Sequence, residues 1–164
     1  MKNVLLVVLT MIIVSPSMAK KVKKQKSLDE LVSINMHRGT CFGRCPDYAI
    51  EIHRSGTLIF TGYRFIDDTG VYLNFINKQV ANKLLDEFVK YRIDTCRDLY
   101  ENQIPDLPQI YYTLKYKKHT QKIYCANWGP KYLTTMAEKM DIIGKKTDSV
   151  GWKRVGGVPR GQGN

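Results

Sequence analysis

The sequence "DYAIEIHRSGTLIFTGYR", residues 47–64, decides the fold because it contains two alternating segments on either side of one turn. Its apolar residues recur at every second position before and after Ser55-Gly56. These positions are Tyr48, Ile50, Ile52, Leu58 and Phe60. A period of two indicates strands with one buried face, and a glycine turn between two such strands predicts a β-hairpin.

The same alternation extends outward from this hairpin in both directions. It precedes the hairpin at residues 32–36, follows it at residues 71–75, and returns in a second hairpin between residues 110 and 125. The apolar positions of the second hairpin are Ile110, Tyr112, Leu114, Tyr116, Ile123 and Cys125. The sequence therefore predicts about six strands, and their arrangement in hairpins favours an antiparallel sheet.

Two other segments have the period of an amphipathic helix. In residues 77–91, apolar side chains recur every three to four positions and so form one face of a helix. Asn77 is placed to cap its first turn. Residues 130–143 begin with Pro130 and end next to Gly144, which is typical of a helix. We therefore expect an α+β fold of order ββββαββα, with both helices packed on one face of the antiparallel sheet.

The first nineteen residues have the features of a secretory signal peptide. Lys2 precedes an apolar run, and the small residues Ser17 and Ala19 suit cleavage after Ala19. The run of about eleven residues is too short to span a bilayer, which takes about twenty helical residues. We expect an exported protein, either periplasmic or secreted, with an uncleaved anchor as the alternative.

The rest of the chain is predicted to be one domain, residues 31–144, between two basic tails. Residues 20–30 include "KKVKKQK", with five lysines, and residues 145–164 end in "GWKRVGGVPRGQGN", with three basic residues among five glycines. The formal net charge is +11; without the signal peptide, which holds only Lys2, 25 basic residues face 15 acidic ones, or +10. Such a surface attracts polyanions.

All cysteines lie in the part of the chain that we expect to be exported, where disulfides persist. They are Cys41, Cys45, Cys96 and Cys125. A bridge between the first two closes a tight loop in which Gly43 supplies backbone freedom. Such a short loop stabilises little through chain entropy, so the bridge mainly fixes the angle between the first two strands. Four cysteines allow three pairings, and their spacing alone leaves all three open.

Two chemical alternatives compete with a structural bridge. A redox centre usually has the spacing Cys-x-x-Cys next to a helix, whereas this pair is more widely spaced and is followed by Pro46 and a strand. A zinc site would use His37, Cys41 and Cys45, which recur at intervals of four residues, with His53 or another cysteine as the fourth ligand. The intervening glycines argue against the helix that would align them, so we expect no metal and no cofactor, and we place both histidines on the polar face of their strands.

The cysteine loop carries a resemblance to a known family. Its motif Cys-Phe-Gly-x-Cys-Pro-x-Tyr is formed by Cys41, Phe42, Gly43, Cys45, Pro46 and Tyr48. Together with Gly56 and Gly62, this motif resembles the bacterial domain of unknown function numbered 6438, over residues 31–143. The resemblance implies the fold and export, but no mechanism, because that family has no established activity.

The other two cysteines lie outside the motif, and their joint presence suggests that they are partners. We therefore expect the bridges Cys41–Cys45 and Cys96–Cys125. The second bridge is expected to join the exit of the first helix to the end of the second hairpin.

No catalytic group of residues emerges from the sequence: there is no nucleophile elbow, no defined acid and base pair, and no nucleic-acid recognition helix. The second hairpin places tyrosines on both of its faces, so half of them lie outside the helix-covered core and form a shallow recognition surface. These are Tyr111, Tyr112, Tyr116 and Tyr124. We expect a noncatalytic binding or structural role in the cell envelope, with an anionic polymer or an envelope protein as partner and no sequence-specific nucleic-acid binding. The alternative is a thiol-disulfide redox protein that uses Cys41 and Cys45.

Overall fold

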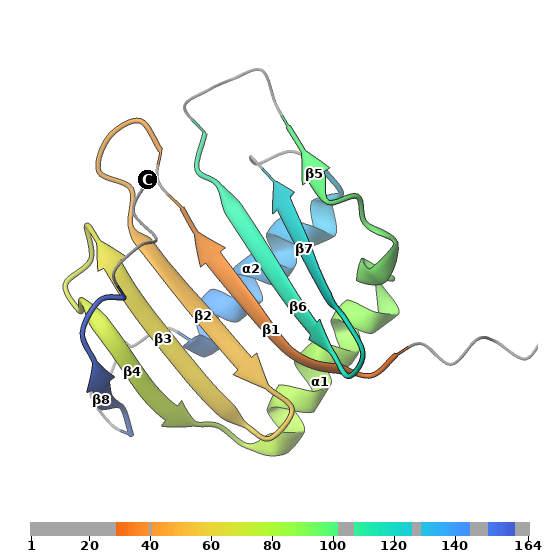
Figure 1. The fold of residues 1–164 in the computed structure, drawn as a ribbon, viewed down its shortest axis with the longest axis horizontal. Helices are drawn as coiled ribbons and strands as arrows, with labels where there is room; N and C mark the ends of the chain where they lie inside the picture. Colours follow the sequence, from red (N-terminus) through yellow and green to blue (C-terminus); the bar gives the residue numbers. More distant parts are fainter. Residues whose placement is uncertain (1–28, 40, 102–106, 126–128, 145–150, 160–164) are drawn as a thin grey trace, which may run out of the picture.

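The computed structural model describes residues 29–39, 41–101, 107–125, 129–144 and 151–159, which form one sheet and two helices (Figure 1). In chain order the elements are β1 (Leu31–Arg38), β2 (Asp47–His53), β3 (Thr57–Arg64), β4 (Gly70–Phe75), α1 (Lys78–Lys90), a 3₁₀ turn (Ile93–Thr95), β5 (Leu99–Tyr100), β6 (Ile110–Tyr116), β7 (Thr120–Cys125), α2 (Lys131–Gly144) and β8 (Lys153–Gly156). The predicted signal peptide and most of the predicted basic N-terminal tail lie outside the described residues.

The strands form a mixed sheet in the order β5-β7-β6-β1-β2-β3-β4-β8. Every neighbouring pair is antiparallel except β5 and β7, which run parallel. Figure 1 shows α1 and α2 on the same side of this sheet. The α+β class and the one-sided helices are therefore confirmed, whereas the six-strand count and the purely antiparallel sheet are wrong.

The hairpin predicted from residues 47–64 is formed by β2 and β3. The two strands pair antiparallel with Ile50 opposite Phe60, so the apolar alternation of both faces the helices. The turn requires Gly56, whose φ is +92° and whose added Cβ would lie 2.4 Å from the carbonyl oxygen of Ile76. A residue with a side chain would be strained here and would collide with backbone.

Both helices begin and end within one residue of their predicted limits. The side chain of Asn77 accepts a hydrogen bond from the backbone N–H of Gln79 at 2.7 Å, which confirms the predicted cap of α1. The helices bury Ala81, Leu84, Leu85 and Phe88 from α1 and Leu133, Met136, Ala137 and Met140 from α2. Burial of each large side chain contributes about 1.5–3 kcal/mol, so this layer supplies much of the core. Neither described helix is both long and apolar enough to cross a membrane.

Polar contacts fix α2 against the sheet. The phenol of Tyr48 donates to Oδ1 of Asp141 at 2.7 Å, and Nε of Arg38 donates to Oδ2 of the same carboxylate at 2.9 Å. The phenol of Tyr112 donates to the carbonyl oxygen of Leu133 at 2.5 Å. Burial, together with the hydrogen bond to Asp141, raises the pKa of Tyr48 above its ordinary value. Tyr48 of the cysteine motif is therefore a structural residue of the helix layer.

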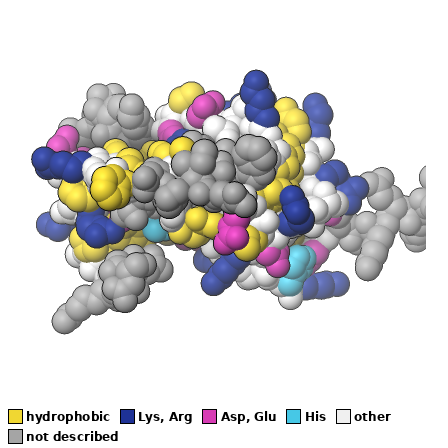
Figure 2. All heavy atoms as spheres, turned by 90° about the horizontal axis from the view of Figure 1, so that it is seen from above, with side chains coloured by type: hydrophobic (Ala, Val, Ile, Leu, Met, Phe, Trp, Pro, Cys, Tyr) yellow, Lys and Arg dark blue, Asp and Glu magenta, His cyan; other side chains and the backbone are white. Residues whose placement is uncertain are grey.

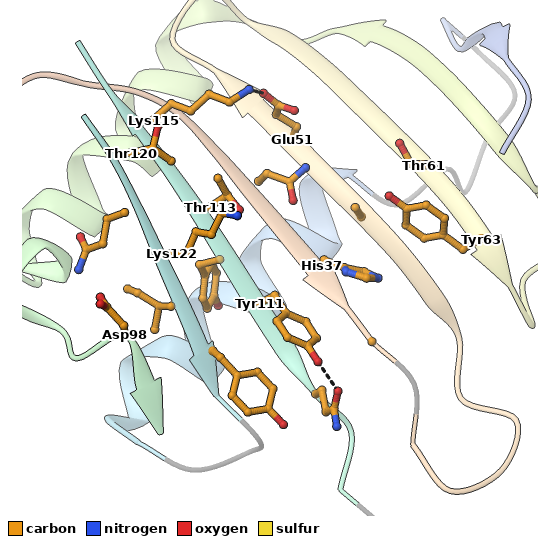
Figure 3. A pocket seen from close by; sticks show the side chains of 18 of the residues that line it. His37, Glu51, Thr61, Tyr63, Asp98, Tyr111, Thr113, Lys115, Thr120 and Lys122 are labelled. Carbon is orange, nitrogen blue, oxygen red and sulfur yellow. Dashed lines mark hydrogen bonds and ion pairs between the residues drawn. The ribbon is translucent and has the colours of Figure 1, made fainter. Parts of the chain in front are cut away.

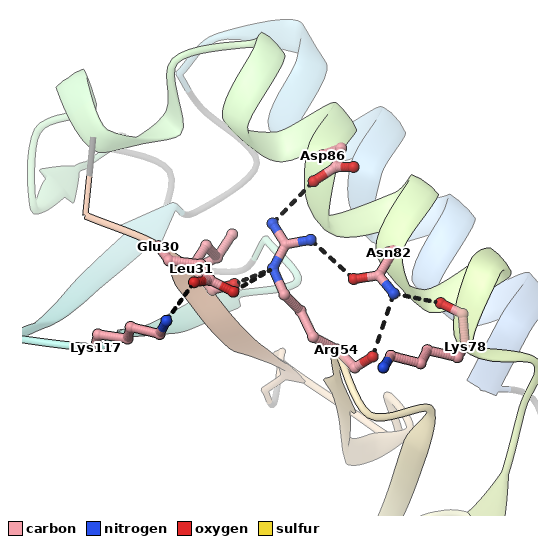
Figure 4. A network of polar contacts seen from close by, with 7 residues as sticks. All are labelled: Glu30, Leu31, Arg54, Lys78, Asn82, Asp86 and Lys117. Atoms are coloured by element: carbon pink, nitrogen blue, oxygen red, sulfur yellow. Dashed lines mark hydrogen bonds and ion pairs between the residues drawn. The ribbon is translucent and has the colours of Figure 1, made fainter. Parts of the chain in front are cut away.

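A second set of polar contacts joins α1 to the strand ends (Figure 4). The guanidinium of Arg54, in the β2–β3 turn, donates to the carbonyl oxygen of Leu31 at 2.5 Å and to Oδ1 of Asn82 at 2.9 Å. It also lies 2.9 Å from Oδ1 of Asp86. One planar side chain thus connects β1, the hairpin turn and α1. Arginine suits this role better than lysine because its forked guanidinium offers several hydrogen-bond donors in fixed directions.

The C-terminal tail prediction is wrong over residues 153–156, which form β8. This strand pairs with β4, where Arg154 lies opposite Tyr72. Trp152 packs its ring edge-on against Phe60, with 6.2 Å between the ring centroids. The segment shows no alternation from which a strand could be predicted. Its strand conformation goes together with its pairing with β4 and with this aromatic contact. Residues 145–150 and 160–164 of the predicted tail lie outside the described part of the chain.

Candidate functional site

The face of the sheet opposite the helices, called the open face, carries the side chains that alternate with the core residues. A hollow of about 1300 Å³ lies over this face and is lined from β7, β6, β1, β2 and β3 (Figure 3). Because side chains point alternately to the two faces of a strand, β1 and β2 contribute every second residue to the hollow, whereas β3, β6 and β7 also contribute consecutive residues. The hollow is the candidate functional site.

One end of the hollow contains a buried carboxylate. The side chain of Asp47 is only 5% exposed, and Nε2 of His37 lies 2.8 Å from its Oδ1. Nε of Arg64 donates to Oδ2 at 3.3 Å. A buried carboxylate is stable only where its oxygens are paired, and here each oxygen has its own partner. Asp47, His37 and Arg64 are called the Asp47 cluster below.

A row of aromatic rings crosses the sheet from β7 to β3 beside the Asp47 cluster. The ring centroids of Tyr124 and Tyr111 are 4.8 Å apart, those of Tyr111 and His37 5.6 Å, and those of His37 and Tyr63 5.2 Å. The antiparallel register produces this row, since Tyr111 lies opposite both Tyr124 on β7 and His37 on β1. Tyr124, Tyr111, His37 and Tyr63 are called the aromatic row.

Two phenols of the aromatic row, those of Tyr63 and Tyr111, have a raised pKa. Burial raises the pKa of Tyr63, and the negative charge of Asp47 adds to this effect. Burial also raises the pKa of Tyr111, with further contributions from Tyr124 and Asp47. Both phenols are therefore neutral groups that can donate a hydrogen bond.

A second carboxylate lies further along the hollow. Oε1 of Glu51 is 3.0 Å from Nζ of Lys115 and 3.0 Å from Nε2 of His53, and it accepts from Oγ of Ser33 at 3.4 Å. Two strands flanking β1 supply Glu51 and Lys115, so this ion pair spans the central strand (Figure 3). Asp47 and Glu51, the two carboxylates that β2 places on the open face, are thus each paired with a cationic side chain.

Next to the aromatic row along the strands lie polar side chains without a charge. Asn35 on β1, Thr61 on β3 and Thr113 on β6 line the hollow and are called the polar floor. Within the described residues their side chains make no hydrogen bond to one another or to a neighbour. Amide and hydroxyl groups both donate and accept, so the polar floor has hydrogen-bonding capacity to offer a ligand.

The Cys41–Cys45 bridge predicted from the sequence is present, with 5.7 Å between the two Cα atoms. The loop that it closes joins the end of β1 to the start of β2, and therefore lies beside the Asp47 cluster. Gly43 has a φ of +121°, as the tight loop requires. Phe42 is 86% exposed, and neighbouring Pro46 is also exposed.

The other predicted bridge is not formed, because Cys96 and Cys125 are both free cysteines in the structure. Sγ of Cys96 lies 2.6 Å from the phenol oxygen of Tyr132 on α2. Cys125 is buried at the end of β7 on the helix side, and its burial, followed by the proximity of Cys96, raises the pKa of its thiol to about 11. The prediction is wrong: the joint presence of two cysteines outside the motif did not indicate a bond, and Cys96 contacts Tyr132 instead.

The histidines lie on the open face, where alternation had placed them, and they do not combine with the cysteines. His37 contacts Asp47, His53 contacts Glu51, and Cys41 is bonded to Cys45. Across the described ranges, no group of three or more histidine, cysteine or acidic side chains is arranged to hold a metal ion. The zinc alternative thus finds no ligand set in this part of the chain.

The site was only partly visible in the sequence. The predicted recognition surface on the second hairpin is represented by Tyr111 and Tyr124, while Tyr112 is buried under the helices. Asp47 and Arg64 were not singled out, although they lie directly opposite each other across the hairpin. Their polar positions within the alternating segment were a signal that could have indicated the pair.

Comparison with known proteins places this sheet in a family. The family model described as Domain of unknown function (DUF6438) matches residues 32–144, which includes β1 to α2 and therefore every strand that lines the hollow. This match confirms the family resemblance inferred from the cysteine loop. No curated protein matches the chain.

Proposed function

The chain belongs to this family of unknown function, and we propose from its residues that it is a noncatalytic binding domain of the cell envelope, with the open face as its binding site. The observation that supports the proposal best is the hollow itself. It joins an aromatic row, two paired carboxylates and a polar floor over five adjacent strands. Concave sites that combine aromatic surface with a few fixed polar groups are the usual form of ligand sites.

The chemistry of the hollow favours binding over catalysis. The contact between His37 and Asp47 orients an imidazole in the way that a carboxylate does in hydrolases, but such a pair acts on a nucleophile. The described residues that line the hollow include neither serine nor cysteine, and none of their threonine hydroxyls is hydrogen-bonded to His37. The raised pKa values of Tyr63 and Tyr111 make their phenols poor nucleophiles and poor bases near neutral pH.

The envelope location is part of the proposal and rests on residues 1–19. Their single lysine, apolar run and small residues before position 20 are typical of a secretory signal. We expect the mature protein to begin near Lys20 and to appear in the exported fraction. N-terminal sequencing of protein from fractionated cells tests this, and intact Met1 on cytosolic protein would contradict it.

Thiol-disulfide exchange at the cysteine loop is the second candidate function. One observation favours it: Cys41 and Cys45 are each partly exposed and already bonded. The nearest cation in sequence, Arg44, lies over the ring of Phe65 at 5.7 Å, and a strand rather than a helix follows the loop. Turnover of a disulfide substrate by native protein, lost in Cys41→Ser, would establish this function in place of the first.

The binding proposal is tested by nuclear magnetic resonance spectra recorded during titration with fractionated envelope extract. We expect selective, saturable shifts of backbone signals from β1, β6 and β3. Tyr111→Ala should abolish them, because Tyr111 is central in the aromatic row. The matched control is Tyr91→Ala, which removes another exposed tyrosine from the helix side of the molecule. Shifts confined to residues outside the open face would contradict the proposal.

A further inference from the structure

We propose that the ligand of the open face is a neutral oligosaccharide of hexoses with equatorial hydroxyl groups, an inference that rests on the binding function proposed above. Four properties of the hollow lead to this class of ligand. They are its balanced charge, its aromatic row, its polar floor and the pairing of its central strands on both sides.

The charge of the hollow differs from that of the whole chain. The lining contains four carboxylates and three lysine or arginine side chains, against 26 basic and 15 acidic residues in the full sequence. The carboxylates of Asp47 and Glu51 are paired with Arg64 and Lys115. Figure 2, which views the molecule from above and not onto the open face, shows lysine and arginine side chains spread over the visible surface instead of gathered at one place. Among the described residues, the lining of the hollow therefore has no excess of positive charge by which a polyanion would be bound.

The aromatic row provides the apolar half of a sugar site. Tyr111 is 37% exposed. In Figure 3, which views the open face, the flat sides of the rings of Tyr63 and Tyr111 are seen. A hexose with equatorial hydroxyl groups presents its C–H bonds on both ring faces, and these flat apolar faces pack against aromatic rings. Large, rigid aromatic side chains contribute such contacts at a small cost in conformational entropy.

The polar floor provides the other half. Sugar hydroxyls donate and accept hydrogen bonds, and so do the amide of Asn35 and the hydroxyls of Thr61 and Thr113. These side chains are unused within the described structure and lie beside the aromatic row. Their positions on three central strands hold them on rigid elements instead of loops. A ligand that covers these three side chains without forming hydrogen bonds to them would bind poorly, because it would remove them from water and leave them unpaired.

An extended peptide fits this surface less well. Peptides that bind sheets usually add a strand to a free edge and pair through the backbone. The strands under the centre of the hollow, β6, β1 and β2, each have a neighbour on both sides, so their backbone groups are already paired. Recognition at this place must use side chains.

The test uses mature protein and three defined probes: cellotetraose and tetra-N-acetylchitotetraose as neutral equatorial sugars, and dextran sulfate as a polyanion. We expect both neutral sugars to produce saturable chemical-shift changes at His37, Tyr111 and Asn35, with a binding isotherm by calorimetry. Tyr111→Ala and Asn35→Ala should each weaken binding by about tenfold or more, which corresponds to about 1.4 kcal/mol. Tyr111→Phe should bind nearly as well as the wild type, since it keeps the ring.

Three outcomes would overturn the inference. If dextran sulfate shifts the open-face signals and the neutral sugars do not, the ligand class is wrong while the binding function stands. If neither the sugars nor envelope extract shift these signals, both proposals fail. If the sugars bind equally well to Tyr111→Ala and to the Tyr91→Ala control, they bind elsewhere. Circular dichroism of each variant shows whether a lost signal reflects lost folding.

Discussion

Nε2 of His37 lies 2.8 Å from Oδ1 of Asp47, across the two strands that the Cys41–Cys45 loop connects. The second carboxylate oxygen accepts from Arg64, so both oxygens of a nearly buried group are used. Asp47→Asn removes the negative charge that is paired with Arg64, and its amide nitrogen must face either the Arg64 donor or Nε2 of His37, which then has to act as the acceptor. We expect this variant to lose about 1–3 kcal/mol in the free energy of unfolding, measured by urea denaturation.

The matched control for this prediction is Asp67→Asn. Asp67 is exposed in the β3–β4 turn, at the same end of the sheet as the Asp47 cluster. Its replacement should change the free energy of unfolding by less than about 0.5 kcal/mol. Equal effects of the two substitutions would show that net charge, and not the contact with His37, determines the stability.

Gly62 lies where a side chain would collide with the backbone, so we expect its replacement to destabilise the sheet. A Cβ added at this residue of β3 would lie 2.0 Å from the carbonyl oxygen of Asp68, in the turn that follows. Because this neighbour is backbone, it cannot move aside as a flexible side chain would. We expect Gly62→Ala to destabilise the protein by about 1–3 kcal/mol, measured by thermal unfolding. Gly157→Ala, whose Cβ would meet nothing within 4 Å, should unfold at the wild-type temperature.

Counting free thiols distinguishes the structure, in which Cys96 and Cys125 are free, from the Cys96–Cys125 bridge expected from the sequence. Denatured, unreduced protein should release two titratable thiols, whereas a Cys96–Cys125 bridge would release none. In native protein near pH 8, Cys125 should react with iodoacetamide much more slowly than Cys96, because its thiol is buried and its pKa is raised to about 11. Peptide mass spectrometry after timed alkylation measures the two rates separately.

The sequence predicted those elements whose residues have a clear period. Both hairpins and both helices follow from alternation or helical spacing, which are local properties. β5 is only two residues long, too short to display a period, and β8 depends on the contact of Trp152 with Phe60. Those two strands are stabilised by distant parts of the chain and were therefore not predictable from their own residues.

The candidate site depends on strand register, which the sequence does not contain directly. Alternation placed His37 on a polar face, but its contact with Asp47 requires that β1 and β2 pair in one particular register across the cysteine loop. The aromatic row likewise requires Tyr111 to lie between Tyr124 and His37, on strands that are distant in sequence. A shift of one residue would turn each of these side chains to the other face of the sheet.

The buried hydroxyl of Tyr116 is expected to lower the stability of the protein. Its phenol oxygen is buried and has no hydrogen-bond partner among the described residues. An unpaired buried hydroxyl is costly, so Tyr116→Phe should raise the free energy of unfolding by about 1 kcal/mol near pH 7. Urea denaturation followed by circular dichroism measures this difference. Tyr91→Phe, at an exposed tyrosine, is the control and should be neutral.

The advantage of Tyr116→Phe should increase with pH. Burial, followed by the nearby negative groups, raises the pKa of Tyr116 from 10.0 to about 12 in the folded protein. The folded state therefore holds this proton more tightly than the unfolded state, and the stability that it contributes is complete below about pH 10 and is lost as the pH rises toward 12. Phenylalanine has no proton to lose, so the gap between variant and wild type should be wider near pH 11 than near pH 7. A gap that stays constant over this range would show that Tyr116 titrates alike in the folded and unfolded states.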